Sequence, residues 1–373
     1  MRLLFVTAQY SPAVGGTEVH THEVARRLLN AGHDVDVVTV DTTARRSYFD
    51  EISGVPVIRV PAWPRGKDWY FAPPIRRVVT LSRVDIVHCQ GYHTLVAPLA
   101  MYAALRSPKP YVLSFHTGGH SSLVRTRMRP LQLRALRPLL VRAARLVAVS
   151  QFEADFVQQK LGLPASDFRI IPNGANLTDD SNTDEVDVDP NLIITAGRLE
   201  RYKGHHKVLK ALPRIVEERP DARLVILGTG PYEGQLRRLA RQLGCADRVE
   251  FRFFPATERE DIAQLLKSAG VITFLSAYEA QGIGALEAIY LRRPALVANV
   301  SAFRELVDRG LATGVEADAT TEEIALAILA QLRNPLVGNG VRLPTWEECT
   351  ETLLDMYRAV LDERAPKRPR RFA

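Results

Sequence analysis

The sequence contains little cysteine and no long apolar run. Its three cysteines lie far apart and form no C-x-x-C pair, so we expect neither a disulfide framework nor a zinc site. This cysteine usage is typical of a reducing cytoplasm. No run approaches the roughly 20 apolar residues that a membrane-spanning helix needs. The apolar start, residues 1–6, stops at Thr7, which is too early for a signal peptide and indicates a first strand.

The chain has 373 residues, a hydrophobic fraction of 46%, a charged fraction of 24% and a net charge of +7. This length favours two or three domains, and the composition is typical of a soluble globular protein. The positive charge suits acidic partners such as phosphates, nucleic acid or an anionic membrane face. An arginine-rich composition would give the same charge, so charge alone identifies no partner.

Strand-like runs alternate with helical patterns throughout the chain. The runs are 3–7, 35–40, 57–60, 86–88, 111–115, 146–149, 169–171, 192–196, 224–227, 249–251, 271–275 and 295–298. This alternation predicts α/β architecture, with parallel sheets covered by helices on both faces. An acidic segment poor in large apolar residues interrupts the series near residue 180, and we interpret it as a linker. The predicted parts are residues 1–176, a linker over 177–190, a second doubly wound domain over 191–345, and a final helix with a basic tail over 346–373.

Two carboxylates flank a glycine pair at a strand-to-helix junction. Glu279 lies in the loop after the strand 271–275, and Glu287 lies in the helix that follows Gly282 and Gly284. At the carboxyl end of a parallel strand, where ligands bind, such acids accept hydrogen bonds from hydroxyl groups, as on a sugar. The N–H groups of a helix start suit a phosphate. A capped helix start explains the same acids equally well.

Gly15 and Gly16 follow the first strand and open the first helix. Backbone without side chains can approach a ligand closely, and a helix start favours an anion. Asp41 ends the second strand, where a dinucleotide-binding fold places its ribose-binding acid. The phosphate loop of that fold needs G-x-G-x-x-G, which is absent here. A structural turn explains two glycines alone equally well.

Arg198 and Lys203 stand five residues apart in the loop after the first strand of the second half. Both can converge on one diphosphate, because arginine offers a bidentate fork and lysine a compact charge. Cations in a loop are often simply solvated. Their place at the carboxyl end of a strand favours a binding site.

Four histidines, His88, His93, His116 and His120, lie at or just after two strand ends of the first half. No carboxylate lies beside them at ligand spacing, so no metal site is predicted. His116 is the best placed of them to meet a ligand. His88 is interpreted as a packed residue.

Taken in order, these motifs resemble the family-4 class of retaining glycosyltransferases over nearly the whole chain. The shared pieces are Gly15-Gly16, Val149-Ser150, 171–174, Gly197-Arg198 with Lys203-Gly204, 228–231, the E-x7-E pair Glu279 and Glu287, and 345–347. The resemblance implies the GT-B architecture of two facing Rossmann-like domains with a cleft between them. It implies an acceptor-binding first domain, a nucleotide-sugar-binding second domain, and a last helix that crosses back to the first.

The resemblance also assigns roles to residues. Arg198 and Lys203 would hold the donor diphosphate, and Glu279 and His116 would serve the donor sugar. These four are the predicted catalytic residues. The predicted donor-binding residues are Gly15, Gly16, Gly197, Val249, Phe251, Gly282, Ile283, Glu287 and Glu305. In that set Val249 and Phe251 would meet the nucleobase, and Glu287 and Glu305 the ribose side.

The chain departs from the family pattern at three places. Gln281 stands where an aromatic residue is usual, which would change contacts with sugar hydroxyls. The segment 252–255 lacks the usual glycine, and Asn176 replaces an aspartate. None of these changes removes a cation from the expected diphosphate site.

The expected reaction moves a hexosyl unit from a UDP- or GDP-sugar to a hydroxyl of a glycan or lipid-linked acceptor with retention of configuration, in cell-surface polysaccharide or glycolipid synthesis. We expect no metal and no cofactor, with the nucleotide diphosphate sugar as co-substrate, and no nucleic-acid partner. A Rossmann-type NAD-dependent oxidoreductase and a non-catalytic nucleotide-sugar binder are the alternatives.

The stretch from Arg125 to Arg145 holds seven arginines and no acid, interleaved with leucines. Such a basic amphipathic stretch suits an anionic membrane surface. Alternatively, its leucines pack inward and its arginines are solvated. The expected location is the cytoplasm, with a peripheral place on the inner face of the plasma membrane under the first alternative.

Overall fold

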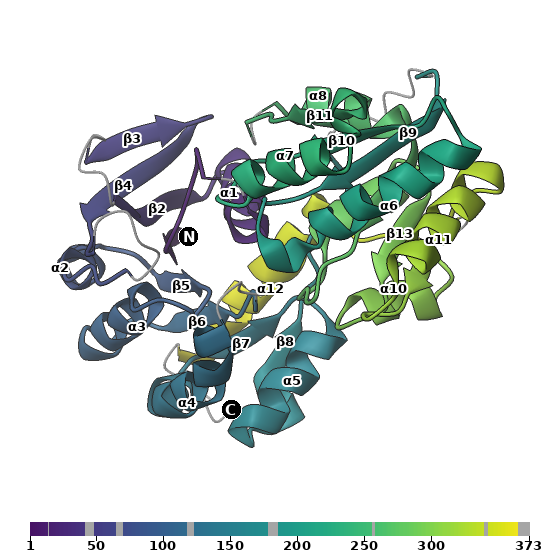
Figure 1. The fold of residues 1–373 in the computed structure, drawn as a ribbon. Helices are drawn as coiled ribbons and strands as arrows, with labels where there is room; N and C mark the ends of the chain where they lie inside the picture. The colour runs from purple at the N-terminus through teal and green to yellow at the C-terminus, as the bar shows by residue number, and fades with distance from the viewer. Residues whose placement is uncertain are drawn as a thin grey trace, which may run out of the picture.

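The computed structural model contains two β-sheets, one from each half of the chain, with helices on both faces of each (Figure 1). The structure describes residues 1–13, 15–41, 48–64, 70–117, 123–177, 186–255, 258–338 and 342–364. The prediction of two doubly wound α/β domains is confirmed. His120, most of the predicted linker and the basic tail lie outside the described residues.

The first sheet has the strand order β3-β4-β2-β1-β5-β6-β7-β8. Its strands are β1 (Arg2–Thr7), β2 (Asp34–Asp41), β3 (Phe49–Ile52), β4 (Val55–Pro61), β5 (Ile86–Gln90), β6 (Tyr111–Ser114), β7 (Arg145–Ala148) and β8 (Phe168–Ile170). β3 is antiparallel to β4, and the other neighbours are parallel. Because β1 lies between β2 and β5, the winding reverses there, and the loops after β1 and β5 border a crevice.

The second sheet has the order β11-β10-β9-β12-β13-β14 and is parallel throughout. Its strands are β9 (Asp189–Ala196), β10 (Arg223–Leu227), β11 (Val249–Arg252), β12 (Ala269–Phe274), β13 (Ala295–Ala298) and β14 (Thr313–Val315). The winding reverses between β9 and β12. The loop that carries Arg198 follows β9, and the loop that carries Glu279 follows β12, so the topology brings these two motifs side by side.

Helices cover both faces of each sheet. They are α1 (Gly16–Asn30), α2 (Pro74–Leu81), α3 (Val96–Arg106), α4 (Leu123–Leu140), α5 (Gln151–Leu161), α6 (His205–Glu218), α7 (Glu233–Gln242), α8 (Arg259–Lys267), α9 (Ile283–Tyr290), α10 (Phe303–Asp308), α11 (Thr321–Arg333) and α12 (Trp346–Arg364). Short 3₁₀ turns lie at Ala165–Asp167, Arg201–Lys203 and Ala246–Arg248.

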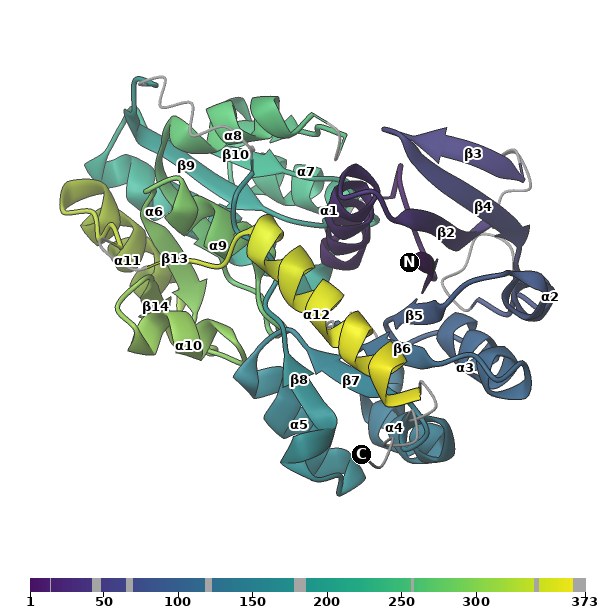
Figure 2. The ribbon, with the colours of Figure 1, turned by 180° about the vertical axis from the view of Figure 1, so that it is seen from behind.

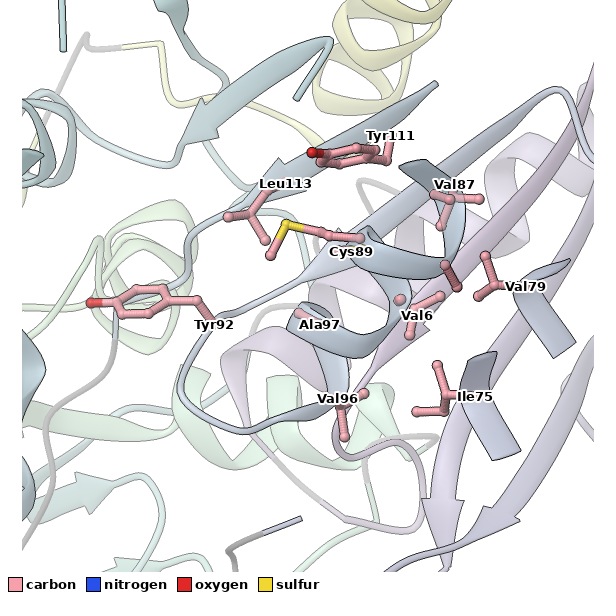
Figure 3. Close-up of a cluster of buried hydrophobic side chains, with 14 of the residues drawn as sticks. Val6, Ile75, Val79, Val87, Cys89, Tyr92, Val96, Ala97, Tyr111 and Leu113 are labelled. Atoms are coloured by element: carbon pink, nitrogen blue, oxygen red, sulfur yellow. The ribbon is translucent and has the colours of Figure 1, made fainter. Parts of the chain in front are cut away.

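Side chains alternate between the two faces of each strand. In β1, Leu3 and Phe5 join the core that α1 and α12 cover, whereas Leu4 and Val6 join the core that α2 to α5 cover. Figure 3 shows part of this second core, with Val6 and Cys89 among its labelled residues. Strands buried on both faces appear in the sequence as continuous apolar runs, which is why most of them could be located there.

The last helix, α12, crosses from the second half to the back of the first sheet (Figure 2). Its residues Trp346, Leu353 and Tyr357 are buried in the same core as Leu3 of β1. The hydroxyl of Tyr357 lies 2.5 Å from Nδ1 of His88. His88 therefore belongs to the core beneath this helix.

Some elements differ from the sequence prediction. Strand β3 and helix α2 were not predicted, and β9 begins at Asp189, inside the expected linker. β3 has little apolar burial to reveal it, since Phe49, Asp50 and Glu51 are all exposed. Short exposed elements carry no continuous apolar run, so the pattern that locates buried strands misses them.

Helix α4, from the arginine-rich stretch, packs four of its leucines inward, whereas Leu131 is exposed. Leu133 and Leu140 are buried, and Leu136 and Leu139 pack partly buried against the same core. The alternative in which the leucines face the protein therefore holds for these residues. In the part of the chain that the structure describes, no helix has the length and apolarity to cross a bilayer.

Candidate active site

A cavity of about 890 Å³ lies between the two halves, where the loops after β1, β5, β9 and β12 meet. Ten of the thirteen predicted site residues line it: Gly15, Gly16, His116, Gly197, Arg198, Lys203, Glu279, Gly282, Ile283 and Glu287. The two halves approach closely here, since a Cβ added to Gly16 would lie 3.5 Å from Cδ1 of Ile283. The structure thus brings motifs from both halves into one cavity.

Lys203 and Glu279 form an ion pair inside this cavity, with 2.5 Å between Nζ and Oε1. Ser276 also donates to Oε1 of Glu279 at 2.7 Å, and the Glu279 amide donates to the hydroxyl of Ser301 at 2.8 Å. Burial disfavours the Lys203 ammonium, but the Glu279 carboxylate and Tyr202 together outweigh burial, so the pKa of Lys203 is raised. Lys203 therefore stays charged, and Glu279 is held in one orientation.

Glycine is required at the junction that leads into α9. Gly282, the residue before α9, has φ of +83°, and a Cβ there would lie 2.2 Å from Cε1 of Phe303. A side chain would clash with the ring and strain the backbone. The loop can therefore turn tightly, which presents the first N–H groups of α9 at the cavity beside Glu279.

Arg198 and Glu18 meet in the cavity from opposite halves. The Arg198 side chain is 40% exposed and contacts Glu200, with 3.2 Å between Nη2 and Oε1. Glu18, in the first turn of α1, lines the same cavity. Burial raises the pKa of Glu18, and the charge of Arg198 opposes this shift. No role was predicted for Glu18 from the sequence, because an acid in the first turn of a helix is commonly found there for its favourable interaction with the helix dipole.

Glu287 is linked to the first half through Arg259. Nη2 of Arg259 lies 3.2 Å from Oε1 of Glu287, and Nε lies 3.3 Å from Oε1 of Glu23 in α1. Nε also donates to the carbonyl of Leu177 at 2.7 Å. Burial raises the pKa of Glu287, and Arg259 opposes the shift. Arg259 was missed because it stands in a charged helix whose local sequence signals nothing.

His116 has a left-handed backbone, with φ of +45°, a conformation that is strained for a residue other than glycine. Its Nε2 lies 2.7 Å from Oε1 of Gln90, and its carbonyl accepts from Nε2 of His93 at 3.3 Å. Its ring centroid lies 4.6 Å from that of His20. Burial is the main cause that holds the pKa of His116 well below its usual range, and the neighbouring His20 lowers the pKa further. His116 is therefore neutral at pH 7.

Gln281 spans the two halves. Its Oε1 accepts a hydrogen bond from the backbone N–H of Asn173 at 2.9 Å and another from the side-chain Nδ2 of Asn173 at 2.6 Å. Oδ1 of Asn173 lies in turn 2.6 Å from Nδ1 of the buried His20. Since its carbonyl oxygen is used between the halves, Gln281 acts here as a tie between domains. This arrangement gives no support to the expectation that Gln281 changes the contacts with sugar hydroxyls.

Val249 and Phe251 lie outside the cavity lining. Both belong to β11 and pack against the core under α6, α7 and α11, and the Arg237 guanidinium lies 4.1 Å from the centre of the Phe251 ring. Phe253 and Phe254, just beyond the strand, line the cavity instead. The physical reason is that the crevice lies at the carboxyl ends of the strands, so the last residue of a strand and those beyond it reach the crevice, and Val249 and Phe251 come before the end of β11 at Arg252.

Glu305 also lies outside the lining. Its Oε1 accepts from the Phe152 amide at 2.8 Å, at the start of α5 in the first half. A carboxylate at a helix N-terminus stabilises the unpaired N–H groups there. Glu305 therefore lies at the contact between the halves, and the structure does not place it on the ribose side.

The chain is similar to known glycosyltransferases. Residues 14–179 match the family model Glycosyltransferase Family 4, and residues 178–341 match the model Glycosyl transferases group 1. An uncharacterized glycosyltransferase of Methanocaldococcus jannaschii is 29% identical over 82% of this chain and 83% of its own. A GDP-mannose:cellobiosyl-diphosphopolyprenol alpha-mannosyltransferase of Xanthomonas oryzae is 28% identical over 78% of this chain and 76% of its own.

Solved structures share the fold. Sucrose-phosphate synthase from Thermosynechococcus elongatus superposes with a TM-score of 0.74 at 18% identity, covering 97% of this chain and 100% of the other. HepE from Anabaena in complex with UDP-glucose superposes with a TM-score of 0.71 at 19% identity, covering 98% of this chain and 99% of the other. The architecture implied by the motifs, two facing Rossmann-like domains around a cleft, is confirmed.

Proposed function

The chain belongs to the family-4, group 1 glycosyltransferases, and from this we propose that it transfers a hexosyl unit from a nucleotide diphosphate sugar to an acceptor hydroxyl, with retention of configuration. The observation that carries the proposal is the convergence of Arg198, Lys203 and Glu279 with the Gly16 backbone in one cavity between the halves. Cations, a fixed carboxylate and helix-start N–H groups together suit a sugar diphosphate.

The diphosphate contacts Arg198 and Lys203 in this proposal. As the bond to the sugar breaks, negative charge develops on the leaving phosphate, and fixed cations stabilise that charge more than they stabilise the bound donor. The N–H groups at the start of α9 add to this stabilisation. These groups supply the positive charge that a divalent ion supplies in other transferases, so the proposed reaction is metal-independent.

Carboxylates and a neutral imidazole hold the rest of the donor. Glu279 accepts hydrogen bonds from sugar hydroxyls while Ser276 and Lys203 fix its orientation. His116 is neutral, so its ring serves as a hydrogen-bond partner and not as a cation. Glu287 accepts from the ribose hydroxyls with the oxygen that Arg259 leaves available.

The acceptor hydroxyl attacks from the face that the diphosphate leaves, with the leaving phosphate helping to take the acceptor proton. Contact between the halves excludes water from this step and so limits hydrolysis of the donor. We propose a UDP- or GDP-sugar as donor. In support, HepE was solved with UDP-glucose, and the Xanthomonas relative is described as using GDP-mannose.

We place the acceptor among glycans and lipid-linked sugars of cell-surface polysaccharide or glycolipid synthesis, at the cytoplasmic side of the membrane. Peripheral contact with anionic lipid would involve the arginines of α4, since Leu133, Leu136, Leu139 and Leu140 pack against the core. Sedimentation with vesicles that contain phosphatidylglycerol tests this contact, and failure to co-sediment at low salt argues against it.

A thermal-shift screen of nucleotide sugars tests the donor assignment. We expect one UDP- or GDP-sugar to raise the unfolding midpoint, because a ligand that binds only the folded state stabilises it by mass action. NAD, NADP and flavins form the other arm of the screen. A shift with these cofactors and none with nucleotide sugars would favour the oxidoreductase alternative.

A further inference from the structure

One wall of the cavity is apolar and open. Five of its residues, Trp63, Phe71, Leu95, Met128 and Leu131, are large apolar side chains that are 46–59% exposed, and all five line the cavity. We call these five residues the apolar wall. Large apolar side chains gathered in one exposed place mark a binding surface more often than chance scatter does.

Three elements of the first half build the apolar wall. Trp63 and Phe71 pair with each other in an isolated antiparallel bridge after β4, and Leu95 immediately precedes α3. Met128 and Leu131 lie on α4, where Ala135 continues the same face at helical spacing. Leu133 and Leu140 occupy the core-facing side. Helix α4 thus has a second apolar face, which faces the cavity and not the core.

Two polar side chains beside the apolar wall use their amide nitrogens within the protein. Nε2 of Gln9 donates to the Tyr70 hydroxyl at 2.6 Å, and Nε2 of Gln132 donates to the Tyr92 carbonyl at 2.8 Å. A sugar ring on this wall would lose water from its hydroxyls and gain few hydrogen bonds, which is costly. A hydrocarbon chain has no hydrogen bonds to water to lose, and its burial against this wall is favourable.

A free donor lies deeper in the cavity, near the predicted chemistry. Nε2 of Gln90 is buried and finds no hydrogen-bond partner among the described residues, while its Oε1 pairs with His116. An unpaired buried amide is costly unless a ligand satisfies it. The cavity therefore has a polar end at Gln90 and an apolar wall that leads outward from it.

We propose that the acceptor is an amphiphile with an aliphatic chain, whose hydroxyl-bearing head binds at Nε2 of Gln90, next to the donor sugar at His116, and whose chain lies on the apolar wall. This inference rests on the proposed function for the identity of the reaction, and it narrows the acceptor to one chemical class. Saturated side chains at Leu95, Met128 and Leu131 suit an aliphatic chain.

Binding of two glucosides that differ only in the aglycone tests the proposal. Octyl β-D-glucoside, kept below its critical micelle concentration, and methyl β-D-glucoside are titrated calorimetrically into the full-length protein, with and without the nucleotide found in the donor screen. We expect the octyl compound to bind at least tenfold more tightly. Equal affinity for the two compounds, or no binding of the octyl compound, would overturn the proposal.

Matched variants locate the binding surface. Leu131→Asp places a charge on the apolar wall at an exposed position, and Leu326→Asp does the same at an exposed position of α11, outside the cavity lining. We expect a loss of at least tenfold in octyl affinity for Leu131→Asp alone, with unchanged unfolding midpoints in both. Equal losses in the two variants, or none in Leu131→Asp, would contradict the assigned wall.

The binding experiments distinguish failure of this inference from failure of the proposed function. If no nucleotide binds while the octyl compound binds and Leu131→Asp weakens it, the donor assignment falls and the apolar site stands. If a nucleotide sugar binds and both glucosides bind equally, the donor assignment is supported and the proposal of an amphiphilic acceptor is rejected. Weaker octyl binding in Leu326→Asp alone assigns the chain to another surface and also refutes the proposal.

Discussion

At the residue scale, the ion pair of Lys203 and Glu279 fixes the charge and the orientation of two side chains that are predicted to bind the donor. The carboxylate that is predicted to hold the sugar also sets the charge state of the lysine that is predicted to hold the diphosphate. A diphosphate bound as proposed would thus meet a fully charged ammonium already in place, and little reorganisation would be needed as charge develops.

Replacing Lys203→Ala should therefore lower kcat/KM for transfer by about 100-fold or more, the magnitude typical of losing one group that stabilises developing charge. Lys210→Ala, an exposed lysine of α6, is the matched control and should leave the rate unchanged. Steady-state kinetics with the donor from the screen measures both. Equal rates in the two variants would remove Lys203 from the diphosphate site.

The buried histidines give stability a defined pH dependence. Burial lowers the pKa of His20 to about 4, whereas histidine in the unfolded chain titrates near 6.5. Between these values the unfolded chain binds the proton and the folded chain does not, so stability present above pH 6.5 is lost as the pH falls towards 4.

Comparing the wild type with His20→Gln isolates this effect from the other titrating groups. From pH 7 to pH 5 the wild type should lose about 2 kcal/mol more unfolding free energy than the variant. Urea unfolding at several pH values measures the difference. Parallel pH profiles for the two proteins would mean that His20 has the same pKa in the folded and the unfolded chain, and would contradict the lowered pKa.

Most site residues were accessible to sequence reasoning because each stands directly after an apolar strand. Arg198, Lys203, Glu279 and His116 all do so, and all reach the cavity. Glu18 and Arg259 were not accessible, since their partners lie in the other half of the chain and nothing local marks them.

At the scale of elements, the carboxyl ends of the strands explain both what the sequence predicted and where it erred. Residues beyond β9 and β12 reach the cavity, whereas Val249 and Phe251, inside β11, pack against the core. The sequence located β11 and assigned ligand contacts to residues within the strand, whereas the cavity is lined by Phe253, just past the strand.

The reassignment of Glu305 from ribose contact to the start of α5 predicts opposite results for two glutamates. Glu305→Gln keeps an acceptor for the Phe152 amide but loses the charge at the helix N-terminus, so it should cost up to about 1 kcal/mol of stability. Its nucleotide affinity should stay unchanged. Glu287→Gln, in the cavity, should weaken nucleotide binding. Calorimetric titration with the free nucleotide measures both variants.

Thermal unfolding provides the control for this pair. Glu305→Gln should lower the unfolding midpoint slightly in the absence of nucleotide, which confirms that the helix contact was lost. If Glu305→Gln weakened nucleotide binding as much as Glu287→Gln, the ribose assignment would be restored.

At the scale of the whole molecule, the two halves form one site because contacts far apart in sequence hold them together. Gln281 bonds to Asn173, 108 positions away, and the Ser150 hydroxyl donates to the Ala280 carbonyl. Helix α12 of the last segment packs on one face of the first sheet (Figure 2). The alternation of strands and helices predicts each sheet, but no local pattern specifies such pairings, so the sequence could not predict how the halves meet.

These contacts attach the loop of Glu279 to the first half at Ala280 and at Gln281. The donor loop and the wall that would receive the acceptor therefore belong to one connected unit, and movement of one half carries the loop with it. This arrangement is suited to a transferase, in which donor and acceptor must be brought together while water is kept out.

The central claim is that this cavity performs a retaining transfer. Its most direct test is proton NMR of the reaction mixture, in which the anomeric configuration of the newly formed product is compared with that of the donor while the reaction proceeds. We predict that the wild type forms a product with the configuration of the donor, and that Arg198→Ala forms it far more slowly. A product of inverted configuration, or a bound donor that is never consumed in the presence of an octyl glycoside and cell-envelope lipid acceptors, would contradict the account.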